Sequence, residues 1–304
     1  MLRPKPPIAA YWLPALLLRA GMAELSASSE AACEAPAVDV AIIGAGASGL
    51  VAASLLQDAG LSIAVLDARE RVGGRLLSTG GVDLGGSWIW QSDARTLGLA
   101  RRLGLETVQQ SLAGDAFAQT APGTRVQNYG NVGDRMAPCG PDALRFSGGY
   151  QALAYKLAAG LPAGAVMLGR RVVTLAAAED SSSVLLTHVG TMDTGPQTLT
   201  AKRVIVAIPS GLAGSSLAFN PPLPEQRRRK MASTSTWCGD WCKVVAHFSA
   251  PFWRKTGASG VVQTAGPFGI WWEGASGVAP EGAVALVGLG FGEQACADGA
   301  SSNH

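Results

Sequence analysis

The stretch VDVAIIGAGASGLVAASLLQDAGLSIAVLD, residues 38–67, decides the fold. It opens with an almost wholly apolar run, Val38–Ile43, as expected of a strand that is buried on both faces. Small and apolar residues then recur at helical spacing over residues 50–59. A second apolar run, Ser62–Leu66, predicts another strand and ends at Asp67. The order strand, helix, strand predicts a βαβ unit with parallel strands.

Between the first strand and the helix, the chain carries the glycine pattern G-x-G-x-x-G. Gly44 permits a tight turn, Gly46 lets the backbone approach a pyrophosphate, and Gly49 allows close helix–strand packing. The helix N-terminus that follows offers N–H groups and a positive dipole end to phosphates. Asp67 lies 23 residues after Gly44, where a carboxylate can accept the ribose hydroxyls and disfavours the 2′-phosphate of NADP. The candidates for binding the nucleotide are Gly44, Gly46, Ala47, Ser48, Gly49 and Asp67.

The next segment separates an FAD protein from an NAD dehydrogenase. Gly73 and Gly74 form a second glycine pair just beyond the ribose position, and Arg75 follows them. An NAD dehydrogenase has no need of another phosphate-approaching loop here, whereas FAD is longer and can be contacted by this loop. A glycine-rich surface turn would explain the glycine pair alone but not Arg75. A third pair suited to close approach, Gly85 and Gly86, follows.

Two runs, Leu66–Arg75 and Asp83–Ser87, resemble the flavin amine oxidase family, which includes the monoamine oxidases. Further matches extend the similarity from about Val38 to Leu289, and compact bacterial-type members match best through the short 105–147 region. These matches are residues 146–150, 171–173, 204–209, 219–224 and 250–253. The resemblance implies FAD. We expect it to be bound non-covalently, because the cysteine that anchors FAD in some members lies in a closing segment that is not evident here. The cofactor-binding residues that it adds are Ala68, Arg69, Gly74, Arg75, Gly85, Gly86, Ser87, Trp88 and, through its backbone beside the adenine, Val172.

Lys243 is the candidate catalytic residue. It lies in Trp241–Phe248, an apolar run typical of a strand, where a lysine is costly unless it is solvated or paired. The run resembles the family segment whose lysine holds a water against flavin N5, and the resemblance implies that role. The alternative is an edge-strand lysine whose ammonium group reaches solvent. A nearby aromatic pair, Trp271 and Trp272, could line a substrate cavity, although such pairs more often belong to a core.

The sequence predicts an α/β fold in which a Rossmann-like FAD-binding domain is interrupted by a mixed-sheet substrate domain. The expected bounds are residues 38–91 and 148–215 for the first domain, and 92–147 and 216–304 for the second. We expect the substrate domain to be incomplete, because the family's closing segment, with another FAD contact, is not evident before His304. Arg203–Ile208 is expected to be a further strand buried on both faces.

The first 37 residues are expected to be a leader or targeting segment. Arg3 and Lys5 precede an apolar stretch, Ile8–Leu18, as in a signal or transit peptide, although Pro14 interrupts it. A disordered leader is an equal alternative. The apolar stretch is too short to span a bilayer, so the sequence offers no firm evidence for a membrane.

Composition and charge exclude several classes of protein. Only 15% of the 304 residues are charged, so much of the chain should be interior. The net charge is +2, and the one dense basic run, Arg227–Lys230, is typical of a solvated helix face, so no nucleic-acid partner is expected. The five cysteines show no zinc spacing, and the three scattered histidines assemble no metal site. Scattered cysteines indicate free thiols in a reducing compartment, which favours the cytoplasm.

The resemblance implies an FAD-dependent amine oxidase. A hydride passes from the α-carbon of the amine to flavin N5, the imine is hydrolysed, and dioxygen reoxidises the flavin to give hydrogen peroxide. A related flavin oxidase or desaturase acting on carbon–carbon bonds is disfavoured by Lys243, and an NAD-dependent dehydrogenase by Arg75. A truncated, non-catalytic FAD-binding fragment is the remaining alternative. The sequence does not identify the amine or the oligomeric state.

Overall fold

The computed structural model describes most of the chain after the expected leader. The described residues are 38–123, 125–131, 139–140, 142–191, 195–236, 238–274, 284–292 and 296. They all belong to Ala35–His304, one of the two units into which the chain divides. The leader expected over residues 1–37 lies outside them. Of the helices in these ranges, none is both long and apolar enough to cross a membrane.

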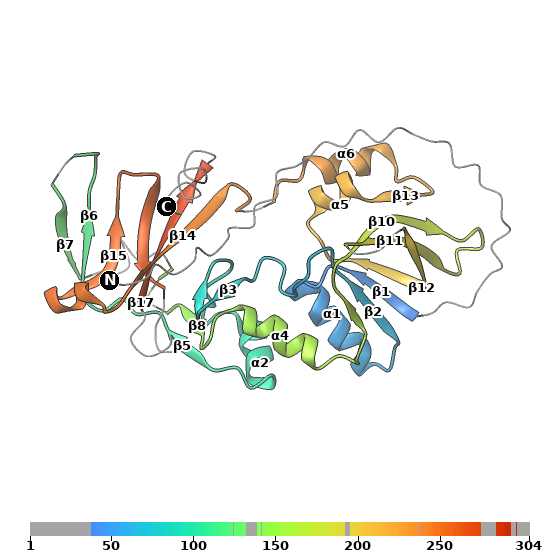
Figure 1. Cartoon of the computed structure of the whole chain (residues 1–304), viewed down its shortest axis with the longest axis horizontal. Helices are drawn as coiled ribbons and strands as arrows, with labels where there is room; N and C mark the ends of the chain where they lie inside the picture. The colour runs from blue at the N-terminus through green and yellow to red at the C-terminus, as the bar shows by residue number, and fades with distance from the viewer. Residues whose placement is uncertain are drawn as a thin grey trace, which may run out of the picture. The chain divides into compact units, whose positions relative to one another are not determined.

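A seven-stranded sheet contains the predicted βαβ unit (Figure 1). Its β1 (Val38–Ile43) pairs in parallel with β2 (Ile63–Leu66) and with β12 (Gln197–Val206), and α1 (Ala47–Asp58) connects β1 to β2. The βαβ prediction is therefore confirmed. The other strands are β9 (Val166–Met167), β10 (Arg170–Ala177), β11 (Val184–Gly190) and β13 (Ala218–Asn220). The strand order is β13-β10-β11-β12-β1-β2-β9. In this order β11 runs antiparallel to both of its neighbours, β10 and β12.

Both faces of β1 are buried, because neighbouring side chains along a strand point to opposite faces. On one face Ile42 packs in a core with Leu50 of α1 and Leu157 of α4 (Gln151–Ala159), which lies beside α1 (Figure 1). On the other face Ile43 packs in a core with Ala213 of α5 (Ser210–Ser216). Two more helices are α2 (Ala94–Arg102) and α6 (Glu225–Ser233), of which α6 packs on α5.

The expectation that Arg203–Ile208 is buried on both faces is wrong. Ile205 and Val206 of β12 remain 36% and 37% exposed. Ile205 is the register partner of Ile42 and shares its face. Because α1 connects β1 to β2 and packs on those two strands, burial on this face decreases toward β12.

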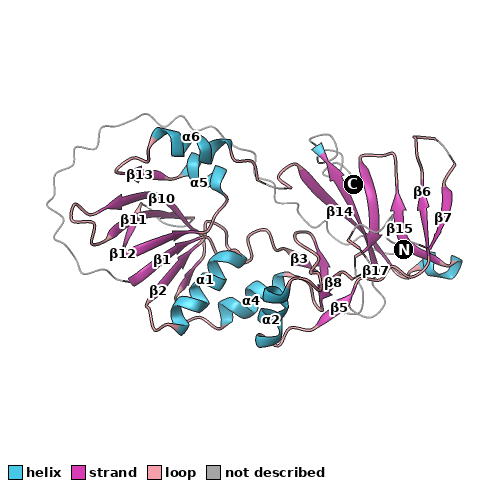
Figure 2. Cartoon of the chain, turned by 180° about the vertical axis from the view of Figure 1, so that it is seen from behind, coloured by secondary structure: helices cyan, strands magenta, loops and turns pink. Residues whose placement is uncertain are grey.

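A second, mixed sheet has six strands (Figure 2). In sheet order they are β14 (Trp241–Phe248), β17 (Val284–Phe291), β16 (Phe268–Glu273), β15 (Ala258–Gln263), β6 (Asp115–Ala118) and β7 (Gln127–Asn131). All neighbours are antiparallel except β15 and β6. Trp272 is 1% exposed in the core of this region, so it is a core residue. The remaining elements of the described residues are two antiparallel strand pairs and a 3₁₀ helix, η1 (Phe252–Thr256). The pairs are β3 (Ser78–Thr79) with β4 (Val82–Asp83) and β5 (Thr107–Gln109) with β8 (Leu144–Phe146).

Candidate cofactor and active site

The first glycine loop joins β1 to α1, and two of its glycines are required by the fold. Gly44 has a φ of +109°, which side-chain-bearing residues rarely adopt. A Cβ added to Gly49 would lie 1.9 Å from the carbonyl oxygen of Gly44. Gly46 differs from both, because a Cβ there would meet no heavy atom of the described residues within 4 Å, and its φ of −75° suits any residue. The protein itself therefore has no need of Gly46, and the space beside it can receive a bound group.

The start of α1 opens onto this space. The first N–H groups of a helix have no partner within it, and they form its positive end. Gly46 is the N-cap residue of α1, no side chain among the described residues caps the helix, and its first turn has no acidic residue. Ala47 is half-buried and Ser48 is exposed, so both are within reach of a ligand. This arrangement suits a phosphate group.

The second glycine loop lies directly against the first. The Gly73 N–H donates to the Ala45 carbonyl oxygen at 2.8 Å, and Gly46 and Gly73 form an isolated parallel bridge. A Cβ on Gly74 would come within 3.2 Å of the Cα of Gly46. This close approach requires a glycine in the second loop, at Gly74, whereas the space beside Gly46 stays open.

Arg71 holds the second loop in shape and was missed by the sequence reasoning. Its guanidinium donates to the carbonyl oxygens of Gly74 at 2.9 Å and of Val72 and Leu76 at 3.3 Å each. Arg75, which was predicted, is exposed, and its side chain makes no hydrogen bond with the described residues. The two arginines therefore differ: one builds the turn, and the other is available to a ligand. The signal for Arg71 was its position within the same R-V-G-G-R run.

Asp67 ties the end of β2 to the first glycine loop. Its buried carboxylate accepts the N–H of Ala45 at 2.8 Å and the N–H of Arg69 at 2.9 Å. The Asp67 carbonyl oxygen accepts the N–H of Arg170, the first residue of β10, at 2.8 Å. Val172 follows two residues later, buried, at a point where the pairing of β10 with β11 is irregular. Predicted residues for the ribose and adenine thus lie together, beside the phosphate loop.

The third glycine loop continues the run from the second. The Gly86 N–H donates to the Arg75 carbonyl oxygen at 3.2 Å, and a Cβ on Gly85 would lie 2.0 Å from the same oxygen. Trp88, at the end of this loop, donates from its indole N–H to Gln110 at 3.2 Å, and its ring centroid lies 4.9 Å from that of Trp272. The three loops are therefore consecutive neighbours, an arrangement that suits a long ligand.

Lys243 of β14 closes this run. Its Nζ donates to the Gly85 carbonyl oxygen at 2.5 Å and to the Ser87 hydroxyl at 2.6 Å. It also lies 5.8 Å from the ring centroid of Trp88 and 5.6 Å from that of Trp272. The alternative of a lysine that reaches into solvent is thus not what the structure shows. The ammonium group points inward and is held by the third glycine loop.

The surroundings of Lys243 make its ammonium form less stable than usual. Burial lowers the pKa of Lys243 from 10.5 to about 8. The carboxylate of Asp83 opposes this change, the guanidinium of Arg145 adds to it, and the Cys238 thiol acts in the same direction as Asp83. Lys243 can therefore hold or release a proton close to neutral pH.

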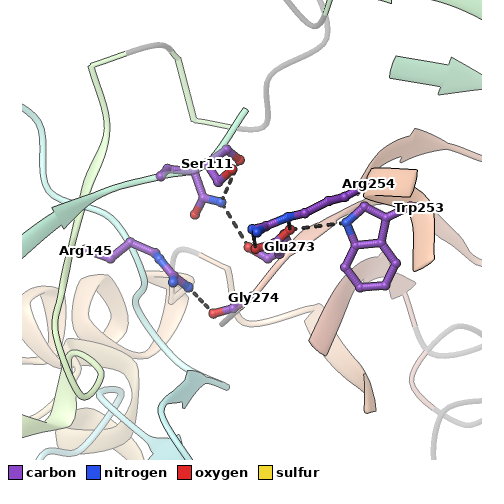
Figure 3. A network of polar contacts seen from close by, with 7 residues as sticks. Ser111, Arg145, Trp253, Arg254, Glu273 and Gly274 are labelled. Atoms are coloured by element: carbon purple, nitrogen blue, oxygen red, sulfur yellow. Dashed lines mark hydrogen bonds and ion pairs between the residues drawn. The ribbon is translucent and has the colours of Figure 1, made fainter. Parts of the chain in front are cut away.

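A buried polar network anchors the end of β16 beside this site (Figure 3). Glu273 is 1% exposed, forms an ion pair with Arg254 and accepts the indole N–H of Trp253 at 3.2 Å. Gln110 donates to the Glu273 carbonyl oxygen at 2.9 Å, and Arg145 donates to that of the following glycine. These contacts fix the strand end next to Trp272. Sequence reasoning missed them because Gln110 and Arg145 lie 163 and 129 residues from their partners along the chain.

Neither metal sites nor disulfides enter this geometry. In the described part of the chain, no group of histidine, cysteine and acidic side chains could hold a metal ion. The four cysteines in those ranges are free thiols, namely Cys139, Cys238, Cys242 and Cys296.

The chain is similar to known proteins in sequence and in fold. The chain matches the family described as Flavin containing amine oxidoreductase over residues 47–145 and 114–288. Amine oxidase [flavin-containing] B of Rattus norvegicus is 51% identical over 74 residues, which are 23% of this chain and 14% of that protein. Putrescine oxidase of Kocuria rosea is 39% identical over 110 residues, 35% of this chain and 22% of that protein. The aligned stretches thus span well under half the length of these relatives.

Solved structures share the fold. Wild-type putrescine oxidase bound to putrescine superposes with a TM-score of 0.70 at 23% identity, covering 86% of this chain and 77% of that one. Cyclohexylamine oxidase from Brevibacterium oxydans IH-35A superposes with a TM-score of 0.71 at 21% identity, covering 86% and 76%. Because the family match extends over most of the sequence, the chain belongs to the flavin containing amine oxidoreductases.

Proposed function

We propose that this chain binds FAD non-covalently and oxidises an amine to an imine, with dioxygen as the electron acceptor and hydrogen peroxide as a product. The observation that carries the proposal is the continuous run of three glycine loops that ends at Lys243. A nicotinamide dinucleotide has no use for the second and third loops, whereas FAD is long enough to contact all three.

Each part of FAD has residues that suit it. The open space at Gly46 and the uncapped start of α1 suit the pyrophosphate, with Ala47 and Ser48 donating their N–H groups. Asp67 suits the adenosine ribose, because each carboxylate oxygen accepts one backbone N–H and can still accept a hydroxyl. When FAD is bound, Val172 would lie beside the adenine, and the exposed Arg75 guanidinium would contact the pyrophosphate and ribityl side.

The third loop and Lys243 are the proposed reaction site. When bound, the flavin supplies a two-electron acceptor for the hydride that leaves the α-carbon of the amine. Lys243, which the loop Gly85–Trp88 holds through Gly85 and Ser87, would hold a water molecule or a proton beside the bound flavin. The rings of Trp88 and Trp272 restrict the access of solvent to Lys243. The imine is hydrolysed once it leaves this site.

We further propose the two domains that are expected from the sequence. Residues 38–91 and 148–215 bind FAD, and residues 92–147 and 216–304 form the substrate side. The seven-stranded sheet supports the first assignment, because six of its strands, β1, β2, β9, β10, β11 and β12, come from those segments. Its edge strand β13 (Ala218–Asn220) comes from the second assignment. For the substrate class, small aliphatic or alicyclic amines are the first choice, since putrescine oxidase and cyclohexylamine oxidase share the fold.

Reconstitution with FAD tests the proposal. The purified full chain is incubated with FAD, freed of unbound cofactor, and mixed with putrescine or cyclohexylamine in aerated buffer. We expect a yellow protein that consumes oxygen and forms hydrogen peroxide in equal amounts. The matched control is Lys243→Met, which should bind FAD but react far more slowly. A chain that folds yet retains no FAD would contradict the proposal.

A further inference from the structure

Asp83 is a buried carboxylate that neither the sequence reasoning nor the proposed mechanism uses. It lies at the end of β4 and is 3% exposed. Its Oδ1 accepts the hydroxyl of Ser78 at 2.6 Å and the N–H of Tyr150 at 2.7 Å. Its Oδ2 has no hydrogen-bond partner among the described residues. Burying a carboxylate oxygen without a hydrogen-bond partner costs folding free energy, so we expect this side chain to have a function that offsets the cost.

The side chain of Asp83 joins its turn to the start of α4. Ser78, which donates to Asp83, also accepts the N–H of Gln151 at 3.1 Å. The approach depends on Gly149, whose φ is +92° and whose missing Cβ would lie 3.1 Å from the Asp83 carboxylate. A carboxylate at a helix N-terminus is stabilised by the N–H groups and the dipole of that helix. Asp83 is therefore fixed from two directions.

The turn that begins at Asp83 supplies the acceptors for Lys243. The Nζ donates to Gly85 at 2.5 Å and to Ser87 at 2.6 Å, and the Asp83 carbonyl oxygen lies at 3.4 Å. A lysine ammonium has three donors, and all three acceptors come from one five-residue turn. The position of Nζ is thus determined by the shape of this turn.

The charges around Lys243 also indicate a role for Asp83. Among the described residues, the charged groups that shift the pKa of Lys243 are Asp83, Arg145 and Cys238. Asp83 is the carboxylate of this set, and burial raises its pKa while the nearby cations Arg145 and Lys243 lower it. The loss of the Asp83 charge would leave Lys243 facing the guanidinium of Arg145 without a counterion.

We propose that Asp83 is a positioning residue for Lys243: its side chain fixes the turn Asp83–Ser87 that holds the ammonium group, and its negative charge balances that group. This inference rests on the proposed function, in which Lys243 is catalytic. It adds a residue that acts through Lys243.

The test is the titration of Lys243 in the full chain, measured without amine or added FAD. Trace labelling with acetic anhydride over a pH series, read by mass spectrometry, follows the neutral amine, and the exposed Lys202 serves as the reference. Asp83→Asn keeps the shape and the Oδ1 acceptor but removes the charge. We expect the pKa of Lys243 to fall by about one unit, so that labelling about two pH units below the wild-type midpoint rises about tenfold.

Two further variants keep the inference falsifiable. Ser87→Ala should lower the pKa of Lys243, because it removes an acceptor of the ammonium form. Ser87→Thr should restore the pKa. If Asp83→Asn only loosened the fold, Lys243 would become exposed to solvent, and its pKa would rise toward the ordinary value of 10.5. A rise, or no change, in Asp83→Asn overturns the inference.

The same variants separate this inference from the proposed function. If the FAD-loaded chain oxidises amines but Lys243 titrates identically in Asp83→Asn and wild type, the function stands and the positioning role of Asp83 is wrong. If Lys243 titrates as expected but no amine is oxidised, the positioning role stands and the function is wrong.

Discussion

Replacing Gly46 with alanine separates what the fold needs from what the cofactor needs. The added methyl group meets no heavy atom of the described residues within 4 Å, and φ −75° with ψ 177° suits alanine. Such a change restricts the unfolded chain, so the free energy of unfolding without FAD should stay level or rise by about 0.4–1 kcal/mol. In the FAD complex the methyl group competes with the pyrophosphate. An overpacked contact costs about 1–3 kcal/mol, which weakens FAD binding by roughly 5- to 150-fold.

The assay measures both quantities on the same samples. Urea unfolding without FAD gives the stability of the fold, and quenching of flavin fluorescence during titration gives the dissociation constant. Gly266→Ala, in an exposed turn where the nearest atom to a new Cβ is 3.7 Å away, is the matched control. It should leave FAD binding unchanged and change stability by no more than the same amount of about 0.4–1 kcal/mol. Gly49→Ala should instead damage the fold itself, because its Cβ would lie 1.9 Å from the Gly44 carbonyl oxygen.

Two results would refute this reasoning. If Gly46→Ala binds FAD as tightly as wild type, the space beside Gly46 does not receive the pyrophosphate. If Gly46→Ala unfolds as readily as Gly49→Ala, packing of the fold requires the glycine. The open space beside Gly46 would then not be evidence for a bound pyrophosphate.

Three further predictions concern the rest of the site. Between about pH 7 and about pH 10, wild type should gain roughly 2–3 kcal/mol of unfolding free energy relative to Lys243→Met, measured by urea unfolding. The reason is that burial holds the pKa of Lys243 near 8, so the folded state releases its proton first and stability rises as the lysine becomes neutral. Arg254→Met should lower stability by about 3 kcal/mol in thermal unfolding, because it strands the buried carboxylate of Glu273, and adding Glu273→Gln should recover part of the loss. Gly85→Ala should weaken FAD binding at least about tenfold, since its Cβ would collide with the Arg75 carbonyl oxygen and open the third loop.

Each of these has a contrary outcome. A stability difference between Lys243→Met and wild type that does not vary with pH would mean that Lys243 is solvated. An Arg254→Met protein as stable as wild type would show that the Glu273 carboxylate is satisfied without the ion pair. Normal FAD affinity in Gly85→Ala would remove the third loop from the cofactor site.

The sequence predicts the parts of the fold that depend on short spacings. The βαβ unit, its glycine loop and the acid at Asp67 follow from residues 38–67, because a strand, a tight turn and a helix are local structures. The resemblance to a known family singled out Lys243, but composition could not show which acceptors hold it. Those acceptors lie 156 to 160 residues earlier in the chain.

The features that the sequence could not predict depend on contacts distant in the chain. Asp83 was quoted as part of a glycine-rich run, yet its importance comes from Lys243 on β14 and from Tyr150 at the start of α4. The network of Glu273 and Gln110 joins residues 163 apart. The exposure of Ile205 follows from where α1 ends its coverage of the sheet, and an apolar run alone does not reveal that.

The most direct test of the account is the absorption spectrum of the FAD-loaded chain mixed with putrescine or cyclohexylamine without oxygen. The account predicts that the yellow flavin bands fade on mixing and return when air is admitted, with hydrogen peroxide formed. A folded protein that takes up FAD but keeps its yellow colour with every amine would contradict amine oxidation, and one that prefers NAD would contradict the cofactor assignment itself.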